Sequence, residues 1–525
     1  MNRRPSNTEL FGGDGTPKIV IVGAGMGGIS AGVLLRNTGI TTFTIYEQSE
    51  RVGGTWWDNQ YPGAEVDVDS YIYSFPFKRH DWTRTHARQA EIHRYLEETV
   101  ADFGLGSHLR LGTGVQRAVW DDDRHVYRLT LTSGAETECH VLISAVGFLN
   151  VPYYPDWPGL DVFEGPCFHT SRWEHHHDLS GKTVAIVGTG STASQLVPAL
   201  QPVVGKLLLF QREPGWVLPK GDRDFTPEER AKLHNPLVHR YRRAKWYWAT
   251  EKRLWNGGAY RPGAPAHTAA EQAARGYIAK MFDDRPDLVA AVTPQYPFWG
   301  KRTIFSSDFY PALKQPNVEL IPHAVASVTA RGVVDAEGIE READVLVLAT
   351  GFQPTNYLAH LEVVGRTGDS IQKHWGGEPR AFLGVTVPTF PNFYMLYGPG
   401  TNGGEIALNL RNQAAYARRA VKRMMREGVT AIEVKRSWAD PYHAWLMSKM
   451  DDTAWAVSSN YFTTSAGKIV TQWPFSALDY GALLKVLGPL SESVRRRGAP
   501  MEDVAVDEDA LRDAVADEPL RYERW

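Results

Sequence analysis

The sequence has few cysteines and no long apolar run, and these absences exclude several classes of protein. Only Cys139 and Cys167 are present, too few for a disulfide framework or a cysteine metal cluster, and we expect a reducing, cytoplasmic environment and no metal. Because no Cys-x-x-Cys pair occurs, the chain lacks the redox pair of a disulfide reductase. No apolar run reaches the roughly 18 residues that span a bilayer. The polar residues 1–14 do not resemble a signal peptide, and residues 521–525 do not resemble an anchor, so we expect no membrane association.

An excess of charge of either sign is also missing. The net charge is −3, so no overall field attracts nucleic acid or an anionic membrane. With 525 residues the chain is too long for one simple core, and two or three domains are expected. Its 17 Trp and 22 Tyr residues indicate either large cores or a wide, aromatic-lined substrate cavity.

Residues 18–47 have the pattern of a strand, a glycine turn, a helix and a second strand. This is the context in which a Gly-x-Gly-x-x-Gly motif binds a dinucleotide. We expect Gly23 to form the tight turn, Gly25 to let the backbone approach a pyrophosphate, and Gly28 to let helix and strand pack closely. The helix N-terminus would face that pyrophosphate, and Glu47 would bind ribose hydroxyls.

A second glycine element follows Glu47 directly and favours FAD as the ligand of this unit. Its residues Gly53-Gly54-Thr55-Trp56 resemble the element of FAD-binding flavoproteins that runs beside the ribityl–pyrophosphate chain. The next loop, residues 59–69, contains Asp67 and Asp69. Both are candidates for a position near the flavin, although Asp69 is more simply explained as a solvated loop acid.

The chain then repeats this pattern. Residues 183–193 repeat residues 18–28, and residues 344–352 repeat residues 140–148. The predicted fold is therefore α/β, with two Rossmann-like dinucleotide-binding domains and a helical insertion. The residues expected at the second pyrophosphate site are Gly188, Gly190, Ser191 and Thr192.

A basic residue at the second site favours NADPH. The strand at residues 206–211 ends at Arg212, where an arginine suits the 2′-phosphate of NADP. Glu213 would oppose that phosphate if it pointed inward, and Arg212 as plain surface charge is the alternative. Lys301 and Arg302 follow a Pro-Gly bend among aromatic residues and are further candidates for phosphate or flavin chemistry.

The remaining segments suggest how the domains are arranged. We predict that residues 1–150 and 386–525 form a split FAD domain, and that residues 151–385 form the NADP domain. Residues 222–300 would be a helical insertion, and residues 487–525 a charged surface tail. The aromatic residues of the insertion would either line the substrate cavity or pack in a core; they are Trp246, Tyr247, Trp248 and Trp255.

Two dinucleotide sites imply hydride transfer from NADPH to FAD, which leaves a flavin reductase and a monooxygenase as the main classes. The segment Phe163-x-Gly165-x-x-x-His169-x-x-x-Trp173 lies between the two units. It resembles the fingerprint of Baeyer–Villiger monooxygenases, the class B flavoprotein monooxygenases. The related N- and S-oxygenating enzymes carry Phe or Tyr at the last aromatic position. The family usually continues with Pro or Asp, and this chain has Glu174.

The resemblance implies that NADPH reduces FAD and that O2 adds at flavin C4a. The resulting peroxyflavin would convert a small-molecule ketone into an ester or lactone. Arg302 matches the family's active-site arginine, Asp67 would hold it in position, and His169 would couple domain motions. The resemblance also adds Trp455 and Lys301 to the NADPH site and places Thr55, Trp56 and Asp67 near FAD.

Two alternatives remain open at this point. One is an N- or S-oxygenating flavin monooxygenase, and the other is a non-catalytic FAD protein. We also expect a monomer or a weak homo-oligomer.

Overall fold

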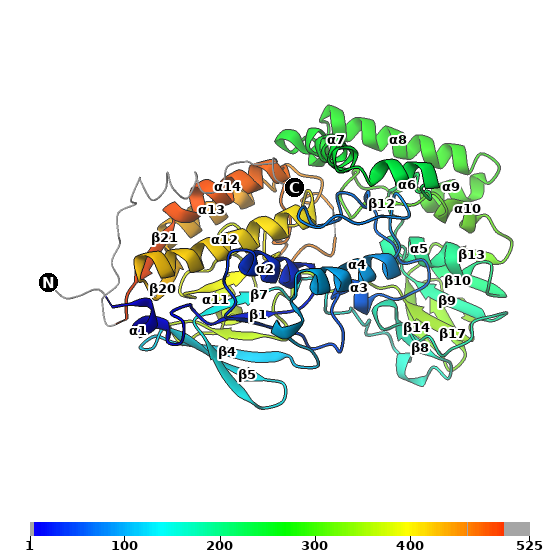
Figure 1. Cartoon of the computed structure of the whole chain (residues 1–525). Helices are drawn as coiled ribbons and strands as arrows, with labels where there is room; N and C mark the ends of the chain where they lie inside the picture. Colours follow the sequence, from blue (N-terminus) through cyan, green and yellow to red (C-terminus); the bar gives the residue numbers. More distant parts are fainter. Residues whose placement is uncertain (1–4, 459, 498–525) are drawn as a thin grey trace.

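Two parallel sheets, one for each glycine motif, organise the molecule (Figure 1). The computed structural model describes residues 5–458 and 460–497, except for the side chains of residues 255–257. Among the described residues, no helix combines the length and the apolar character that crossing a membrane requires. The α/β fold with two Rossmann-like units is therefore confirmed.

The first sheet has the strand order β19-β7-β1-β2-β3, with every pair parallel. Its strands are β1 (Ile19–Val22), β2 (Phe43–Tyr46), β3 (Leu109–Arg110), β7 (Val141–Ser144) and β19 (Phe393–Met395). All four residues of β1 are buried, as the continuous apolar run predicts. Ile19 and Ile21 pack toward helices, and Val20 and Val22 pack on the opposite face. The sheet is thus covered on both faces.

Helices cover one face of this sheet and a second, largely antiparallel sheet covers the other. The helices are α2 (Met26–Arg36) and α12 (Ile406–Glu427), which pack against each other. The covering sheet consists of β4 (Val115–Asp121), β5 (Val126–Leu131), β6 (Glu136–Cys139) and β18 (Glu362–Val364). Because β18 pairs with β4, the chain has returned to the first unit by residue 362. This pairing moves the proposed domain boundary upstream from residue 386.

Shorter elements complete the first unit. They are α1 (Asn7–Phe11), α3 (Thr55–Asp58), α4 (Gln89–Asp102), the 3₁₀ helix η1 (Gly106–His108), α11 (Ile371–Trp375), β20 (Ala431–Val434), α13 (Arg436–Ser448), α14 (Ala477–Leu490) and β21 (Glu492–Arg495). The prediction that a surface tail begins at residue 487 is wrong for its first part. Helix α14 continues to Leu490, and β21 pairs with β20 and buries Val494. Residues 498–525 lie outside the described part.

The second unit repeats the architecture with the strand order β13-β10-β9-β17-β8. Its strands are β8 (Cys167–His169), β9 (Thr183–Val187), β10 (Lys206–Phe210), β13 (Val318–Ile321) and β17 (Val345–Leu348). Helices α5 (Ser191–Leu200) and α10 (Phe309–Leu313) pack on one face. The other face meets the meander β14 (Val325–Val328), β15 (Gly332–Asp335) and β16 (Glu340–Glu342). The short strands β11 (Val217–Leu218) and β12 (Ile304–Phe305) pair beside this sheet.

The helical insertion lies above the second unit in the view of Figure 1. It comprises α6 (Pro227–Leu233), α7 (Pro236–Leu254), the 3₁₀ helix η4 (Trp255–Tyr260), α8 (Pro265–Met281) and α9 (Pro286–Val292). A capping box at Thr226 and Glu229 starts α6, with Pro227 at its first position. Residues 227–292 are therefore mostly helical.

Candidate functional site

One large cavity connects the two glycine turns. Its volume is about 1460 Å³, above the usual range for a single small-molecule site. The lining includes Gly23 and Gly25 from the first turn and Gly188 and Gly190 from the second. The cavity is thus continuous from one glycine turn to the other.

The first turn has the backbone geometry that its glycines predict. Gly23 has φ +103°, and a Cβ atom there would lie 2.6 Å from the carbonyl oxygen of Ala145. A Cβ on Gly28 would overlap the carbonyl oxygen of Gly23. Gly25 and Gly54 face each other so closely that a Cβ on Gly54 would lie 3.0 Å from Cα of Gly25. The two glycine elements thus form one cradle without side chains, open for a ligand's phosphate chain.

Glu47 fixes this cradle and also lines the cavity. Its Oε2 accepts a hydrogen bond from the backbone N–H of Ala24 at 2.7 Å, and its Oε1 accepts one from Ser49 at 2.9 Å. A carboxylate has about four lone-pair positions, so two remain for ribose hydroxyls. Thr55 and Trp56 begin the short helix α3 and lie in the same wall.

The second turn reproduces the first. Gly188 has φ +112°, and a Cβ there would overlap the carbonyl oxygen of Ala349, as at Gly23 and Ala145. Ser191 and Thr192 open helix α5 and line the cavity. Their backbone N–H groups lie in the first turn of the helix, which lacks internal acceptors and attracts anions.

A charged cluster follows strand β10 at the mouth of the second site. Arg212, Glu213 and Lys301 all line the cavity. The Lys301 ammonium forms an ion pair with the Glu213 carboxylate and lies 5.0 Å from the ring centre of Tyr296. Arg212 is exposed and forms no ion pair with any residue that the structure describes. Glu213 therefore engages Lys301 and leaves Arg212 available to a phosphate.

Arg302 and Asp67 meet in the wall between the two glycine turns, where their side chains form an ion pair. Burial opposes ionisation of Asp67, but the Arg302 guanidinium outweighs it, so the pKa of Asp67 lies below its usual value. The neighbouring carboxylate raises the pKa of Arg302, against the effect of burial. Although 44% of the Arg302 side chain is exposed, that surface faces the cavity. The cavity thus contains a fixed positive charge.

Four tyrosines surround this cation, and the sequence pattern did not single them out. The charge of Arg302 acts to lower the pKa of each hydroxyl. All four side chains line the cavity: Tyr73, Tyr260, Tyr397 and Tyr461. Burial is the main factor that raises their pKa values, so their hydroxyls stay protonated. Trp455 is buried, and its ring centre lies 4.3 Å from that of Tyr260. The predicted residue Trp455 thus joins the aromatic wall.

Two aromatic residues in this wall have unusual backbone conformations. Trp299 has φ +65° and Tyr397 has φ +61°, values that residues other than glycine rarely adopt. Trp299 lies three residues before Arg302, and a Cβ at the intervening Gly300 would overlap the side chain of Ser458. Backbone strain of this kind concentrates at functional sites. The loop that carries Lys301 and Arg302 is therefore tightly packed.

His169 lies outside the cavity lining, as does Gly28, whereas the other predicted site residues line the cavity. Its Nδ1 accepts a hydrogen bond from the N–H of Ser171 at 3.1 Å, so Nε2 carries the proton and donates to the carbonyl of Gly351 at 3.0 Å. Burial lowers the pKa of His169 to about 4, so the ring is neutral near pH 7. His169 therefore ties the fingerprint segment to the end of β17.

The fingerprint segment is part of the second sheet. Residues 167–169 form β8, the edge strand of the second sheet, with His169 paired to Leu348. Trp173 packs edge-on against Phe168, at 5.1 Å between ring centres. Glu174 accepts a hydrogen bond from Nε2 of His177 at 2.9 Å. The fingerprint is thus built into the second unit rather than suspended between the units.

The aromatic side chains of α7 do not line the cavity. Trp246 and Trp248 are exposed to solvent, and Tyr247 is buried away from the lining. The side chain of Trp255 lies outside the described set. Instead, Thr250 and Arg253 of the same helix reach the cavity.

Known proteins are similar to this chain over most of its length. A family model described as pyridine nucleotide-disulphide oxidoreductase matches residues 20–197. The chain is 36% identical over 475 residues to a protein named Baeyer-Villiger monooxygenase from Pseudomonas aeruginosa, covering 89% of each. It is 36% identical over 471 residues to one of the same name from Streptomyces coelicolor, covering 88% of this chain and 90% of the other.

A solved structure shows the same arrangement of domains. The crystal structure of cyclohexanone monooxygenase from Rhodococcus sp. Phi1, bound to NADP+, superposes with a TM-score of 0.82 at 28% identity. The match covers 91% of this chain and 99% of that chain.

Proposed function

The chain belongs to the Baeyer–Villiger monooxygenases, an FAD- and NADP-dependent family, and from this premise we propose its reaction. It inserts one oxygen atom of O2 beside the carbonyl of a small-molecule ketone and yields an ester or lactone, with NADPH as reductant. The observation that carries this proposal is the Arg302–Asp67 pair in the wall of a cavity shared by both nucleotide sites.

The residues around the first turn suit FAD. The facing pair Gly25 and Gly54 leaves room for a pyrophosphate, and Glu47 offers its free lone pairs to a ribose. Gly23 and Gly28 shape the turn, and Thr55 and Trp56 complete the wall. Bound FAD supplies the redox chemistry, since it accepts a hydride from NADPH and then activates O2.

NADPH occupies the second turn in this proposal. The first turn of α5 receives the pyrophosphate with the N–H groups at Ser191 and Thr192. Arg212 binds the 2′-phosphate, and Lys301 joins it when its pair with Glu213 opens. Trp455 adds its ring to the aromatic wall beside Tyr260.

Arg302 stabilises the negative charge that develops on the carbonyl oxygen of the ketone when an oxygen atom derived from O2 adds to the carbonyl carbon. A guanidinium stays protonated in a dry cavity, whereas a lysine there readily loses its proton. Asp67 orients this cation through its ion pair and keeps it in the wall. A fixed donor of this kind typically lowers the barrier by about 3–4 kcal/mol. His169 has a structural role in this scheme, because its two ring nitrogens already have partners.

A competition experiment tests the proposal directly. The purified protein is incubated with NADPH, isotopically labelled O2, a ketone and a thioether, and the products are identified by mass spectrometry. Labelled ester or lactone supports the proposal, and labelled sulfoxide alone assigns the chain to N- or S-oxygenation. If NADPH is not consumed, the protein is a non-catalytic flavoprotein. Cyclic, linear and aryl ketones are then compared to define the substrate.

We further propose that the enzyme works in the cytoplasm as a monomer or weak homo-oligomer. Both cysteines are free thiols, and Cys167 is exposed, which suits a reducing compartment.

A further inference from the structure

A buried ion pair joins the two units behind the cavity wall. The ammonium of Lys220 lies 2.7 Å from Oε1 of Glu65, and only 1% of the Lys220 side chain is exposed. Lys220 follows β11 of the second unit, whereas Glu65 lies in the loop of the first unit that carries Asp67. Lysine is rarely buried to this degree because its charge loses hydration. The burial of Lys220 therefore suggests a role beyond filling space between the two units.

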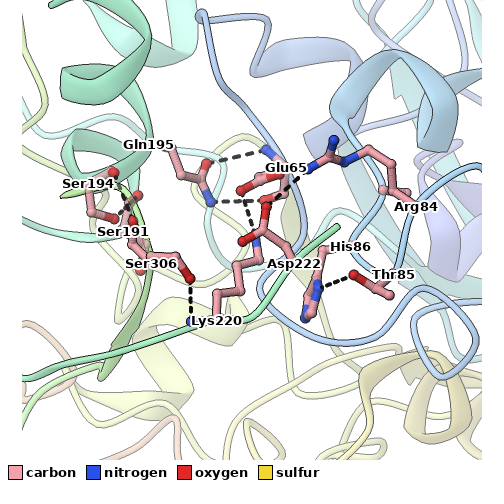
Figure 2. Close-up of polar contacts among 12 residues, drawn as sticks. Glu65, Arg84, Thr85, His86, Ser191, Ser194, Gln195, Lys220, Asp222 and Ser306 are labelled. Atoms are coloured by element: carbon pink, nitrogen blue, oxygen red, sulfur yellow. Dashed lines mark hydrogen bonds and ion pairs between the residues drawn. The ribbon is translucent and has the colours of Figure 1, made fainter. Parts of the chain in front are cut away.

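The second unit also holds the backbone of the same loop residue. Oε1 of Gln195 accepts hydrogen bonds from Tyr61 Oη at 2.8 Å and from the N–H of Glu65 at 3.3 Å. Nε2 of Gln195 donates to the carbonyl of Glu65 at 3.0 Å. A Cβ on Gly63 would overlap the carbonyl oxygen of Gln195, so α5 touches the loop directly. Figure 2 shows Gln195 and Lys220 converging on Glu65.

These contacts create an alternating row of charges through the wall. Asp67 pairs with Arg302 on the cavity side and also senses the positive charge of Lys220. Lys220 pairs in turn with Glu65, whose pKa is raised by burial against the opposing effect of Lys220. Glu65 lines the cavity and Lys220 does not. Lys220 therefore acts on the site only through its neighbours.

The other groups around this row do not replace Lys220. Arg84 also weakly lowers the pKa of Glu65, but its guanidinium bonds Asp222 at 3.0 Å and Asp224 at 2.6 Å. Burial, and then the charge of Lys220, lower the pKa of His86 to about 4, so this ring is uncharged near pH 7. Besides Arg302 and His86, the groups that interact with the charge of Asp67 include three phenols that stay protonated: Tyr61 of the same loop, Tyr73 and Tyr461.

We propose that Lys220 and Gln195 are positioning residues, which hold the loop at residues 61–67 so that Asp67 stays ionised and aligned on Arg302. This proposal rests on the role of Arg302 in the proposed function. It also implies that the second unit controls the position of a residue in the first unit. Because Gln195 lies on α5, the helix whose first turn lines the second nucleotide site, the seating of that helix determines where Asp67 lies.

A charge-pair series tests the role of Lys220. Lys220→Met, Glu65→Gln and the double variant are purified with FAD bound, and ester yield per NADPH is measured against pH. Lys220→Met removes a cation that favours ionised Asp67, so the acid limb of the profile moves to higher pH by about one pH unit. Glu65→Gln does not move it upward. The double variant regains thermal stability because no unpaired charge remains, yet it keeps the shifted limb.

Two results overturn this role. If the double variant has the acid limb of the wild type, Lys220 only neutralises Glu65. If Lys220→Met leaves the limb unmoved, Lys220 does not act on Asp67. The matched control is Lys206→Met, which removes an exposed ion pair to Glu319 at 2.8 Å in the same unit and keeps the wild-type profile.

A second pair of variants tests Gln195. Gln195→Leu lowers ester yield per NADPH several-fold, because the loop loses its backbone partners, while FAD reduction by NADPH continues. Gln201→Leu at the C-cap of the same helix breaks a bond to Asn317 within the second unit and leaves the yield unchanged. Equal yields in both variants contradict the proposal.

A readout without product separates this proposal from the proposed function. The absorbance of bound FAD, titrated through the acid range, reports the ionisation of carboxylates in the cavity wall. If the wild type forms no ester, the proposed function fails, and an upward shift of that titration in Lys220→Met still supports the positioning role. An unshifted titration overturns it.

Discussion

Arg302 and Asp67 form an ion pair although 235 residues separate them along the chain. One lies after the insertion of the second unit, and the other lies in a loop of the first unit. The pair therefore exists only when both units are docked. If the two units separate, Arg302 loses the partner that fixes its orientation.

Arg302→Ala separates the two halves of the reaction. Reduction of FAD by NADPH should continue at a similar rate, because the nucleotide turns are untouched. Ester formation should fall roughly 100- to 1000-fold, as expected when one donor to a developing oxyanion is lost. Stopped-flow reduction and product yield measure the two halves. Oxygenation of ketones at the normal rate would remove Arg302 from the catalytic assignment.

Arg212→Ala should raise the KM for NADPH roughly 10- to 100-fold and leave the KM for NADH nearly unchanged, because only NADPH carries the 2′-phosphate. Steady-state kinetics with both coenzymes measure this difference. Arg331→Ala is the matched control, since Arg331 is an exposed arginine of the same unit that pairs with Glu342 at 3.6 Å. Equal changes for NADPH and NADH would place Arg212 outside the phosphate site.

Glu213→Gln should lower the KM for NADPH by up to about fivefold. The substitution frees Lys301 from its ion pair and removes a negative charge from the phosphate site. The KM for NADH should stay the same, because NADH brings no phosphate to that position. A higher KM for NADPH would mean that Glu213 holds Lys301 in its binding position rather than competing for it.

Glu405→Gln should make the protein more stable than the wild type, by an amount that grows as pH rises. Burial raises the pKa of Glu405 to about 7, against the effect of Arg243, whereas an unfolded glutamate has its usual value of 4.5. The folded state therefore retains a proton that the unfolded state releases, and stability falls as pH increases from 4.5 through 7. Replacing Glu405 by glutamine should therefore increase the free energy of unfolding by about 1–3 kcal/mol above neutral pH.

Thermal unfolding at about pH 5 and about pH 8 measures this difference. The variant should gain in melting temperature mainly at the higher pH. Glu50→Gln changes an exposed carboxylate of the same unit and should behave like the wild type at both values. A gain of the same size at both pH values would contradict the assignment to Glu405.

The sequence predicted the nucleotide turns because their requirements are local and steric. A positive φ at Gly23 and Gly188 leaves no room for a side chain, so the glycine spacing itself encodes the geometry. The acid after β2 and the base after β10 are encoded equally locally, by the residues at which the strands end.

The wall of the cavity could not be predicted in the same way. Lys220 and Gln195 have no motif of their own, and their importance comes from contacts with Glu65 more than 100 residues away. Strand β8 was missed because three residues are too few to show an alternating pattern. Its pairing with β17 depends on a partner nearly 180 residues downstream.

Strand β19, which completes one edge of the first sheet, has a consequence for biosynthesis. The second sheet uses strands between Cys167 and Leu348, so a contiguous segment can close it during translation. The first sheet must wait for residues 393–395 to leave the ribosome. The unit translated first is therefore completed last, and the backbone edge of β7 stays unpaired until then. During that interval the nascent flavin domain is the part of the chain most exposed to aggregation and to chaperones.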